Sequence, residues 1–252
     1  MGLERGDAIA ALGGGVVGDL AGFTAASWMR GIEWIGVPTS LMAQVDSSIG
    51  GKTGIDLAEG KNLVGAFHQP RLVVIDPEAL ATLPERERRA GLAEVVKCGV
   101  IADRALFAWL ERHVARLEAL DLAAYEEAVW RSVRAKARIV RTDERERADG
   151  PRTALNFGHT TGHAIERVLD YRRLRHGEAV AIGMRVAVAL SLAHARLAPR
   201  HGRRITALLD ALGLPRRIPA AVDARVAGRD GVGQEAPQPA QPLGVDAPDR
   251  PC

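Results

Sequence analysis

Histidines at helical spacing are the residues of this sequence best suited to bind a metal ion. His159 and His163 are four positions apart in a stretch with helical character, so their imidazoles share one face, and Glu166 follows one turn later. His176 then opens the next apolar segment. A catalytic zinc ion usually takes three protein ligands from histidine and carboxylate and keeps one position open. The pattern therefore predicts a metal site that still needs a carboxylate.

Three glutamates compete to supply that carboxylate. Glu166 and Glu178 lie close to the histidines in sequence, whereas Glu94 lies far earlier, one helical turn from Lys97. A structural ion pair on a mostly apolar helix is the plain interpretation of Glu94 and Lys97. Two histidines four positions apart are, by themselves, more often partly buried or solvated helix residues than a pair of metal ligands. Flanking glycines favour the metal site, because glycine weakens a helix unless a backbone or ligand comes close. Spacing leaves the choice of glutamate open.

A glycine triplet at residues 13–15 lies between a short apolar run and a helical segment. Glycine lets backbone amides approach a pyrophosphate, and the start of the following helix is positively polarised. The spacing is not the complete dinucleotide fingerprint, so a tight strand-to-helix turn explains the triplet equally well.

Residues 37–65 are rich in hydroxyls, amides, glycines and lysines. Such a segment makes a poor core but a good cradle for a phosphorylated, polyhydroxy ligand. A long polar surface loop is the alternative. Loops of this length are usually functional or disordered, and the interspersed apolar residues argue against disorder.

The elements that must position these residues fall into two halves. Short apolar runs at residues 8–12, 32–37 and 72–75 alternate with glycine turns and predict buried strands. From residue 84 to 214 the pattern predicts long amphipathic helices, with N-caps at Asp103 and Asp121, a break at Pro199 and an end at Gly213. Beyond Pro215 the chain is rich in proline and glycine, so residues 216–252 are expected to form a disordered tail.

Composition excludes several classes of function. The chain has 252 residues, of which 47% are hydrophobic and 26% charged, as in a globular protein. Its net charge of +3 is too small and dispersed for a nucleic-acid partner. Apolar runs are too short for a membrane span, and neither a secretory signal nor a cysteine pattern is present in the printed sequence. We therefore expect no nucleic-acid or membrane partner and a cytoplasmic location.

Seven blocks of this sequence resemble, in order, those of the 3-dehydroquinate synthases, the sugar-phosphate cyclases of the shikimate pathway. The blocks are GGGVVGD, VPTS, DSSIGGKTGID, GKN, LAEVVK, LNFGHTTGHAIE and HGEAV, and they span roughly residues 7–215. The resemblance implies conversion of 3-deoxy-D-arabino-heptulosonate 7-phosphate to 3-dehydroquinate and phosphate by a homodimer that uses NAD and a zinc or cobalt ion. It also implies the fold class: a partial, Rossmann-like NAD-binding α/β domain with a parallel sheet at 1–82, then an all-α metal and substrate domain at 83–215.

The resemblance also implies a role for individual residues. Its metal ligands map onto Glu94, His159 and His176, and its proton-transfer histidine onto His163. The implied substrate pocket comprises Asp46, Lys52, Asn62, Lys97, Lys136, Arg152 and Asn156, with Arg30 reaching across the dimer interface. The implied NAD contacts are Gly14, Gly15, Val16, Asp19, Thr39, Ser40, Lys61 and Thr82, together with Asp46, Lys52 and Asn62. Ser40 stands where a threonine is usual.

The sequence departs from the family pattern at both ends. Family members carry earlier strands and helices before the glycine triplet. They also carry a later lysine pair, which is missing here because the amino-acid sequence after about Ala221 resembles the product of a frameshift. Loss of edge elements from a parallel sheet exposes apolar surface. We therefore expect a truncated chain with low stability and an affinity for NAD, measured by calorimetry, below that of an intact relative.

Three alternative functions are weighed against this one. An NAD- and metal-dependent polyol dehydrogenase has a similar architecture, but its substrate has no anion to pair with Lys52, Lys136 and Arg152. A cyclase for another sugar phosphate is disfavoured by the GGKTGID block. An inactive fragment is the third alternative, and an assay of phosphate release with a His159→Ala control separates it from the enzyme.

Overall fold

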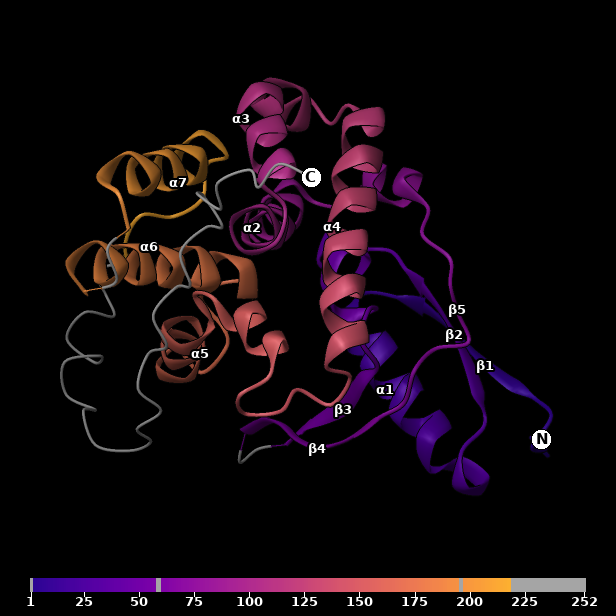
Figure 1. Cartoon of the computed structure of the whole chain (residues 1–252). Coiled ribbons are helices and arrows are strands. Elements are labelled where there is room, and N and C mark those ends of the chain that lie inside the picture. Colours follow the sequence, from indigo (N-terminus) through magenta and orange to yellow (C-terminus); the bar gives the residue numbers. More distant parts are fainter. Residues whose placement is uncertain (1, 58–59, 195–196, 219–252) are drawn as a thin grey trace, which may run out of the picture.

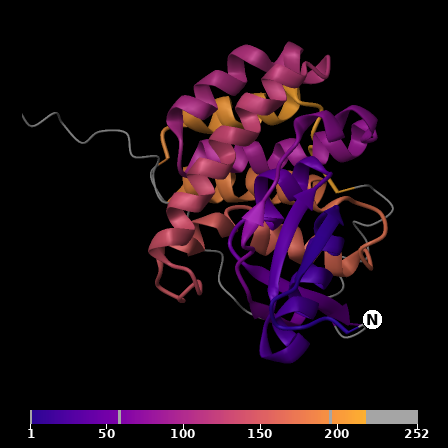
Figure 2. The same cartoon turned by 90° about the vertical axis from the view of Figure 1, so that its right-hand side faces the viewer.

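The computed structural model describes residues 2–57, 60–194 and 197–218, without the side chains of residues 60–62. Expectations for Lys61, for Asn62 and for the tail beyond residue 218 therefore lie outside the described residues. Figures 1 and 2 show the strands gathered on one side of the molecule and the long helices of the second half on the other.

A three-stranded parallel sheet forms the first layer. Strand β1 (Ala8–Gly13) pairs with β2 (Glu33–Pro38), which pairs with β5 (Leu72–Val73). Helix α1 (Gly15–Ser27) packs on one face, where Ala11, Ala25 and Trp34 are buried. The three strands lie at the apolar runs that predicted them, and the expected order of strand, glycine turn and helix is present. A short 3₁₀ turn, η1 (Trp28–Arg30), leads from α1 into β2.

The opposite face of this sheet is apolar and exposed. Ala10, Ile35 and Leu72 lie in register across the three strands, and Leu12 on β1 is 69% exposed. Helices normally cover both faces of a parallel sheet. This exposed row is a physical reason to expect low stability.

The segment 37–65 is more ordered than a long surface loop, the alternative considered for it. It contains a π-helical turn, η2 (Ala43–Ser47), and an antiparallel hairpin of β3 (Lys52–Leu57) and β4 (Gly60–Phe67). A Cβ atom added at Gly65 would lie 2.1 Å from the Thr53 carbonyl oxygen, so this glycine serves close strand pairing. The hairpin was not expected from the sequence, because polar, glycine-rich strands show no clear alternation.

Within the part of the chain that the structure describes, six α-helices follow the 3₁₀ turn η3 (Pro77–Thr82). They are α2 (Glu85–Ile101), α3 (Arg104–Glu118), α4 (Leu122–Thr142), α5 (His159–Val168), α6 (His176–His194) and α7 (Pro199–Ala211), with a 3₁₀ turn, η4 (Pro151–Asn156), before α5. Helix α2 is buried from Ala90 to Val100 and packs against α3, α4, α6 and α7.

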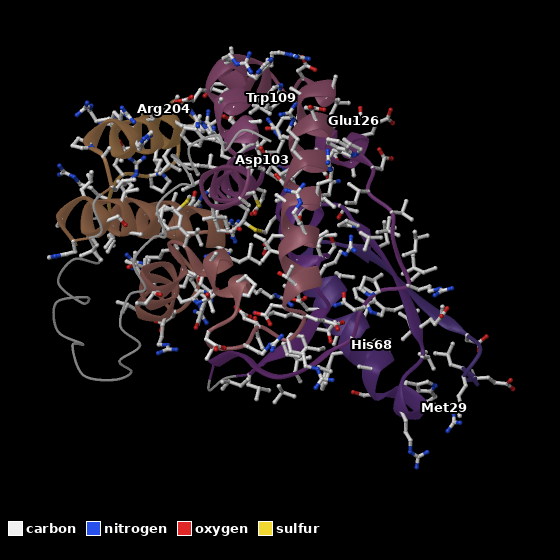
Figure 3. The ribbon with its side chains drawn as sticks, viewed as in Figure 1. Met29, His68, Asp103, Trp109, Glu126 and Arg204 are labelled. Atoms are coloured by element: carbon white, nitrogen blue, oxygen red, sulfur yellow. The ribbon has the colours of Figure 1, made fainter. Side chains whose placement is uncertain are left out.

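The predicted helix boundaries are confirmed. Asp103 caps α3 by accepting the Leu106 amide at 2.9 Å, and Figure 3 labels it at that end. Asp121 caps α4 by accepting the Ala123 amide, Pro199 begins α7, and Gly213 follows it with a φ of +66°.

Among the described residues, α6 is the one helix long and apolar enough to cross a membrane. Half of its apolar stretch is buried inside the protein, where the helix packs between α2, α5 and α7. These contacts are those of a core helix.

Candidate active site

A carboxylate and two imidazoles converge from three different helices. Glu94 on α2 is fully buried, and its Oε1 lies 3.7 Å from His159 Nε2 on α5 and 3.8 Å from His176 Nε2 on α6. The two ring centroids are 5.2 Å apart. Residues that lie 65 and 82 positions from Glu94 in the sequence thus face a common point with it.

Hydrogen bonds at the far side of each ring orient these imidazoles. Nδ1 of His176 donates to Glu166 Oε2 at 3.2 Å, and Nδ1 of His159 faces the Phe157 carbonyl oxygen at 3.4 Å. Because both partners accept, each ring in its neutral form carries its proton on Nδ1 and presents the Nε2 lone pair toward Glu94. Burial lowers the pKa of His176, but the hydrogen bond to Glu166 and the charge of Glu94 outweigh it and raise that pKa, so a cation, either a proton or a metal ion, is favoured at this ring. Burial, reinforced by Lys97, also holds the pKa of His159 well below its usual value, which keeps that ring neutral.

The donors at this point fit a metal ion. Glu94 Oε1 is buried and has no hydrogen-bond partner among the described residues. Two imidazole lone pairs and a carboxylate oxygen facing one another are costly unless a cation lies between them. Two nitrogens and one oxygen are a donor set that zinc and cobalt accept.

Glycines make the close approach of these helices possible. A Cβ atom added at Gly177 on α6 would lie 1.8 Å from the Ala90 carbonyl oxygen on α2. One added at Gly183 would lie 1.9 Å from the carbonyl oxygen of Gly158, which itself has a φ of +83°. The glycines next to the histidines therefore serve close backbone contacts.

A set of three histidines is the geometric alternative. Nitrogens of His159, His163 and His176 lie within 4.8 Å of one another, and the His163 ring is 5.3 Å from that of His159. His163 is exposed, however, whereas the unpaired oxygen of Glu94 is buried. The buried acceptor favours Glu94 as the third donor.

The other two candidate glutamates have different partners. Glu178 accepts two hydrogen bonds from Arg86, both of 2.7 Å, and one from the Arg175 amide at 2.8 Å. Glu166 contacts the back of the His176 ring instead of the common point. Glu166 was not recognised in this supporting role from the sequence, since spacing alone made it a candidate ligand.

We expect Glu166→Gln to weaken metal binding about 10- to 100-fold, because the amide supports the His176 ring less well than the carboxylate. Competition between the protein and a chelator for cobalt measures this affinity. Glu178→Gln is the matched control and should bind cobalt within about twofold of the parent. A larger loss with Glu178→Gln than with Glu166→Gln would contradict this assignment.

A cluster of cations surrounds Asp46 beside the converging histidines. Lys136 Nζ on α4 donates to Asp46 Oδ1 at 2.6 Å and to its carbonyl oxygen at 2.7 Å. Lys97 Nζ pairs with Glu94 and lies 3.7 Å from Asp46 Oδ1. Burial alone would raise the pKa of Asp46, but Lys136 and Lys97 hold it well below its usual range. Lys97 thus connects this cluster to the histidines, and the expected Glu94–Lys97 ion pair is present.

Arg152 and Lys52 extend the cluster toward solvent. Arg152 is buried and donates to the Gly50 carbonyl oxygen at 3.0 Å, while Lys52 pairs with Glu146. Asn156 donates to the same Glu146 carboxylate at 3.1 Å. Apart from Asn62, the residues expected to line a substrate pocket are therefore close together, and their excess of positive charge suits an anionic ligand.

Binding of inorganic phosphate is expected to weaken as the pH rises through about 8. Partial burial, followed by Arg152 and Lys136, lowers the pKa of Lys52 to about 8 although 54% of the side chain is exposed, so this lysine is charged below that pH and neutral above it. Calorimetric titrations from pH 7 to 9 measure the effect, and Lys52→Ala should remove most of it. Equal affinities across this range would show that Lys52 does not bind the anion.

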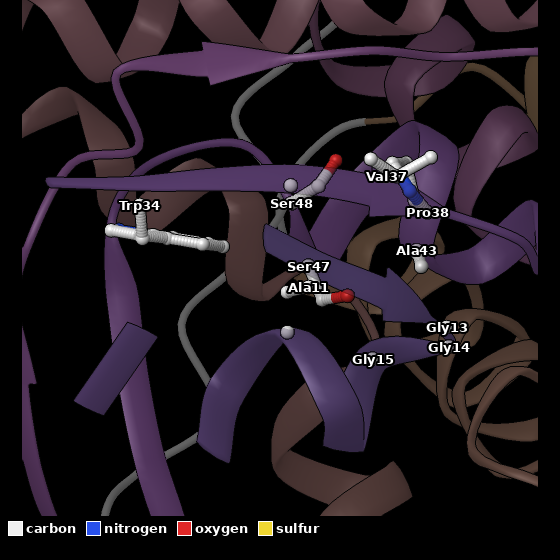
Figure 4. Close-up of a pocket in the computed structure, with 12 residues that line it drawn as sticks. Ala11, Gly13, Gly14, Gly15, Trp34, Val37, Pro38, Ala43, Ser47 and Ser48 are labelled. Carbon is white, nitrogen blue, oxygen red and sulfur yellow. The ribbon is translucent and has the colours of Figure 1, made fainter. Parts of the chain in front are cut away.

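The glycine turn borders a small hollow (Figure 4). Gly14, Gly15, Pro38, Ser47 and Ser48 line it at the meeting of β1, β2, α1 and η2. Burial, with Asp56 and Asp46, raises the pKa of the neighbouring Asp19 to about 6. The hollow contains two of the expected NAD contacts.

The other expected NAD contacts that the structure describes lie on several elements. The Thr39 amide donates to the Gly13 carbonyl oxygen at 2.9 Å, and Ser40 Oγ accepts the Ala43 amide at 3.3 Å. Val16 is exposed on α1, and Thr82 is exposed at the end of η3. Arg30 lies on the exposed turn after α1, next to Met29, which Figure 3 shows far from the helical half.

Two family models match the chain over most of its length. They are 3-dehydroquinate synthase N-terminal, at residues 1–90, and 3-dehydroquinate synthase C-terminal, at residues 91–228. The chain belongs to the 3-dehydroquinate synthase family. The C-terminal match runs past residue 221, where the sequence was expected to diverge from that family.

Curated members of the 3-dehydroquinate synthase family are similar across most of this chain. The 3-dehydroquinate synthase of Halorhodospira halophila (strain DSM 244 / SL1) is 56% identical over 222 residues, or 88% of this chain. That of Pelobacter propionicus (strain DSM 2379 / NBRC 103807 / OttBd1) is also 56% identical over 222 residues. The chain spans 62% and 61% of the lengths of these two relatives.

Solved structures of sugar-phosphate cyclases are also similar. A 2-deoxy-scyllo-inosose synthase complexed with carbaglucose-6-phosphate, NAD+ and Co2+ is 31% identical, with a TM-score of 0.82 over 90% of this chain and 61% of its own. ValA, a 2-epi-5-epi-valiolone synthase from Streptomyces hygroscopicus subsp. jinggangensis 5008 with NAD+ and Zn2+ bound, is 32% identical, with a TM-score of 0.77 over 88% of this chain and 64% of its own. A sulfoacetaldehyde reductase from Bifidobacterium kashiwanohense, at 16% identity and a TM-score of 0.59, shares the fold alone; the alignment covers 87% of this chain and 68% of that one.

Proposed function

We propose that the protein is a 3-dehydroquinate synthase that converts 3-deoxy-D-arabino-heptulosonate 7-phosphate to 3-dehydroquinate and inorganic phosphate. The observation that carries this proposal is the convergence of Glu94, His159 and His176 beside a cluster of buried cations. The substrate has both a phosphate and a carboxylate, and each needs cationic partners.

Lys52, Arg152 and Asn156 would bind the anionic ends of the substrate. Arg152 offers a planar fork that suits carboxylate or phosphate, and Lys52 is the most accessible cation of the cluster. Lys136, held by Asp46, would fix the distance between these groups and the histidines. A neutral polyol offers no charge to these cations, which disfavours the dehydrogenase alternative.

Glu94, His159 and His176 would hold a zinc or cobalt ion, and residues around Gly14 and Gly15 would hold NAD. When bound, the metal ion would supply a Lewis acid and NAD a reversible hydride acceptor. His163 is exposed beside the three ligands, and its imidazole is suited to move protons between substrate oxygens.

A homodimer in the cytoplasm completes the proposal. Trp28 and Met29, which precede Arg30 on the exposed turn, are 45% and 44% exposed. Exposed apolar side chains around an arginine suit a protein interface, and Arg30 would then reach the partner's site.

The test measures inorganic phosphate and NADH together. With substrate, NAD and cobalt, the protein is expected to release phosphate without net NADH, and His159→Ala to release none. Stoichiometric NADH from a glycerol-like substrate would favour a dehydrogenase. Equal phosphate release by His159→Ala, or none by the parent protein, would contradict the proposed function.

A further inference from the structure

The loop between α4 and η4, residues 143–150, places acidic groups over the cation cluster. Asp143 at its start is buried and accepts the Arg147 amide at 3.0 Å. Glu144 is held twice, because its carboxylate accepts Gln69 Nε2 at 3.0 Å and its carbonyl oxygen accepts Arg152. The start of the loop is therefore held by hydrogen bonds from Gln69 and from Arg152.

Glu146, further along this loop, occupies the outer part of the cluster. Its carboxylate pairs with Lys52 and accepts the Asn156 amide group at 3.1 Å. Its side chain is 17% exposed, whereas that of Lys52 is 54% exposed. A carboxylate thus already satisfies two of the groups expected to bind an anionic substrate.

The other cations of the cluster have partners that cannot move easily. Lys97 and Lys136 pair with Glu94 and Asp46, which lie on the helical elements α2 and η2. Glu146 instead lies on a loop, with a φ of +52° that costs energy for a residue other than glycine. Among the pairs that the structure describes in this cluster, Lys52–Glu146 is therefore the one most easily opened.

We propose that Glu146 is a built-in counter-anion, which an anionic group of the substrate must displace from Lys52 and Asn156. This inference rests on the proposed function and adds a rule of selectivity to it. A phosphate dianion carries two negative charges, so it more than replaces the single charge of Glu146 beside Lys52 and can open this ion pair. A neutral polyol offers no replacement charge and leaves Lys52 with Glu146.

Binding of inorganic phosphate to the full chain, without metal or NAD, tests this role. Glu146→Gln keeps the size of the side chain but removes its charge, so it should bind phosphate about fivefold more tightly than the parent, the upper range for a partly exposed ion pair. Glu144→Gln, the same change on the same loop, should leave the affinity within about twofold. A Glu146→Gln variant that binds no more tightly than Glu144→Gln would overturn the proposal.

Hydrogen exchange gives a second, independent readout. Saturating phosphate should speed exchange of the amides at 143–150 in the parent protein, because the displaced Glu146 no longer holds the loop. Unchanged or slower exchange would overturn the proposal, and so would the absence of phosphate binding in every variant. If phosphate binds as expected but His159→Ala still turns over substrate, the role of Glu146 as a counter-anion is supported and the proposed function is contradicted.

Discussion

Replacing Glu94 with glutamine is expected to lower the affinity for cobalt or zinc by more than about a hundredfold, since losing even a group that supports a ligand costs 10- to 100-fold. Glu94 is the one carboxylate of the described residues that faces both His159 Nε2 and His176 Nε2, at 3.7 and 3.8 Å. A neutral amide oxygen is a much weaker partner for a divalent cation. Phosphate release should be lost together with the metal.

A chelator competition titration measures the affinity of Glu94→Gln, and thermal unfolding shows whether the variant is folded. Lys97 loses its Glu94 partner but keeps Asp46 at 3.7 Å, so the fold should survive. Glu166→Gln is the graded comparison, with a smaller loss. If Glu94→Gln bound metal like the parent while His163→Ala lost it, three histidines would be the ligands instead.

Gly177→Ala is expected to lower the free energy of unfolding by about 2–3 kcal/mol, the upper part of the range for forcing extra volume into a packed contact. The added Cβ would lie 1.8 Å from the Ala90 carbonyl oxygen, so α6 must move away from α2. His176 precedes Gly177, and Glu94 lies one turn after Ala90. This movement should separate the two groups and weaken metal binding in whatever protein remains folded.

Chemical denaturation gives the free energy of unfolding of this variant. Gly18→Ala is the matched control, since it is also a helical glycine but has nothing within 4 Å of an added Cβ. We expect this control to be neutral or stabilising, by up to about 1 kcal/mol. Equal stabilities of the two variants would contradict the role assigned to the contact between α2 and α6.

Much of the fold follows from local patterns. Asp103 and Asp121 begin helices because an aspartate cap satisfies free amides, and both residues could be identified from the sequence. The parallel strands follow from apolar runs, but burial of those runs is limited to the face against α1, where Ala11 and Trp34 lie. The hairpin of β3 and β4 was missed, because Gly54 and Gly65 are there for close strand pairing, which no local pattern reveals.

The site was only partly predictable. His159 and His163 share a helix face by spacing, but the distance from Glu94 to His176 depends on how α2 packs against α6. That packing is a tertiary contact, which the sequence indicated through resemblance alone. Glu146 was missed because it lies on a loop without a motif, and only its pairing with Lys52 and Asn156 reveals it.

Anomalous X-ray scattering from crystals grown with zinc, recorded at the zinc edge, tests the central claim most directly. We expect a single strong peak within bonding distance of Glu94 Oε1, His159 Nε2 and His176 Nε2. A peak bonded to His163 in place of Glu94, or no peak among these residues, would contradict the proposed metal site.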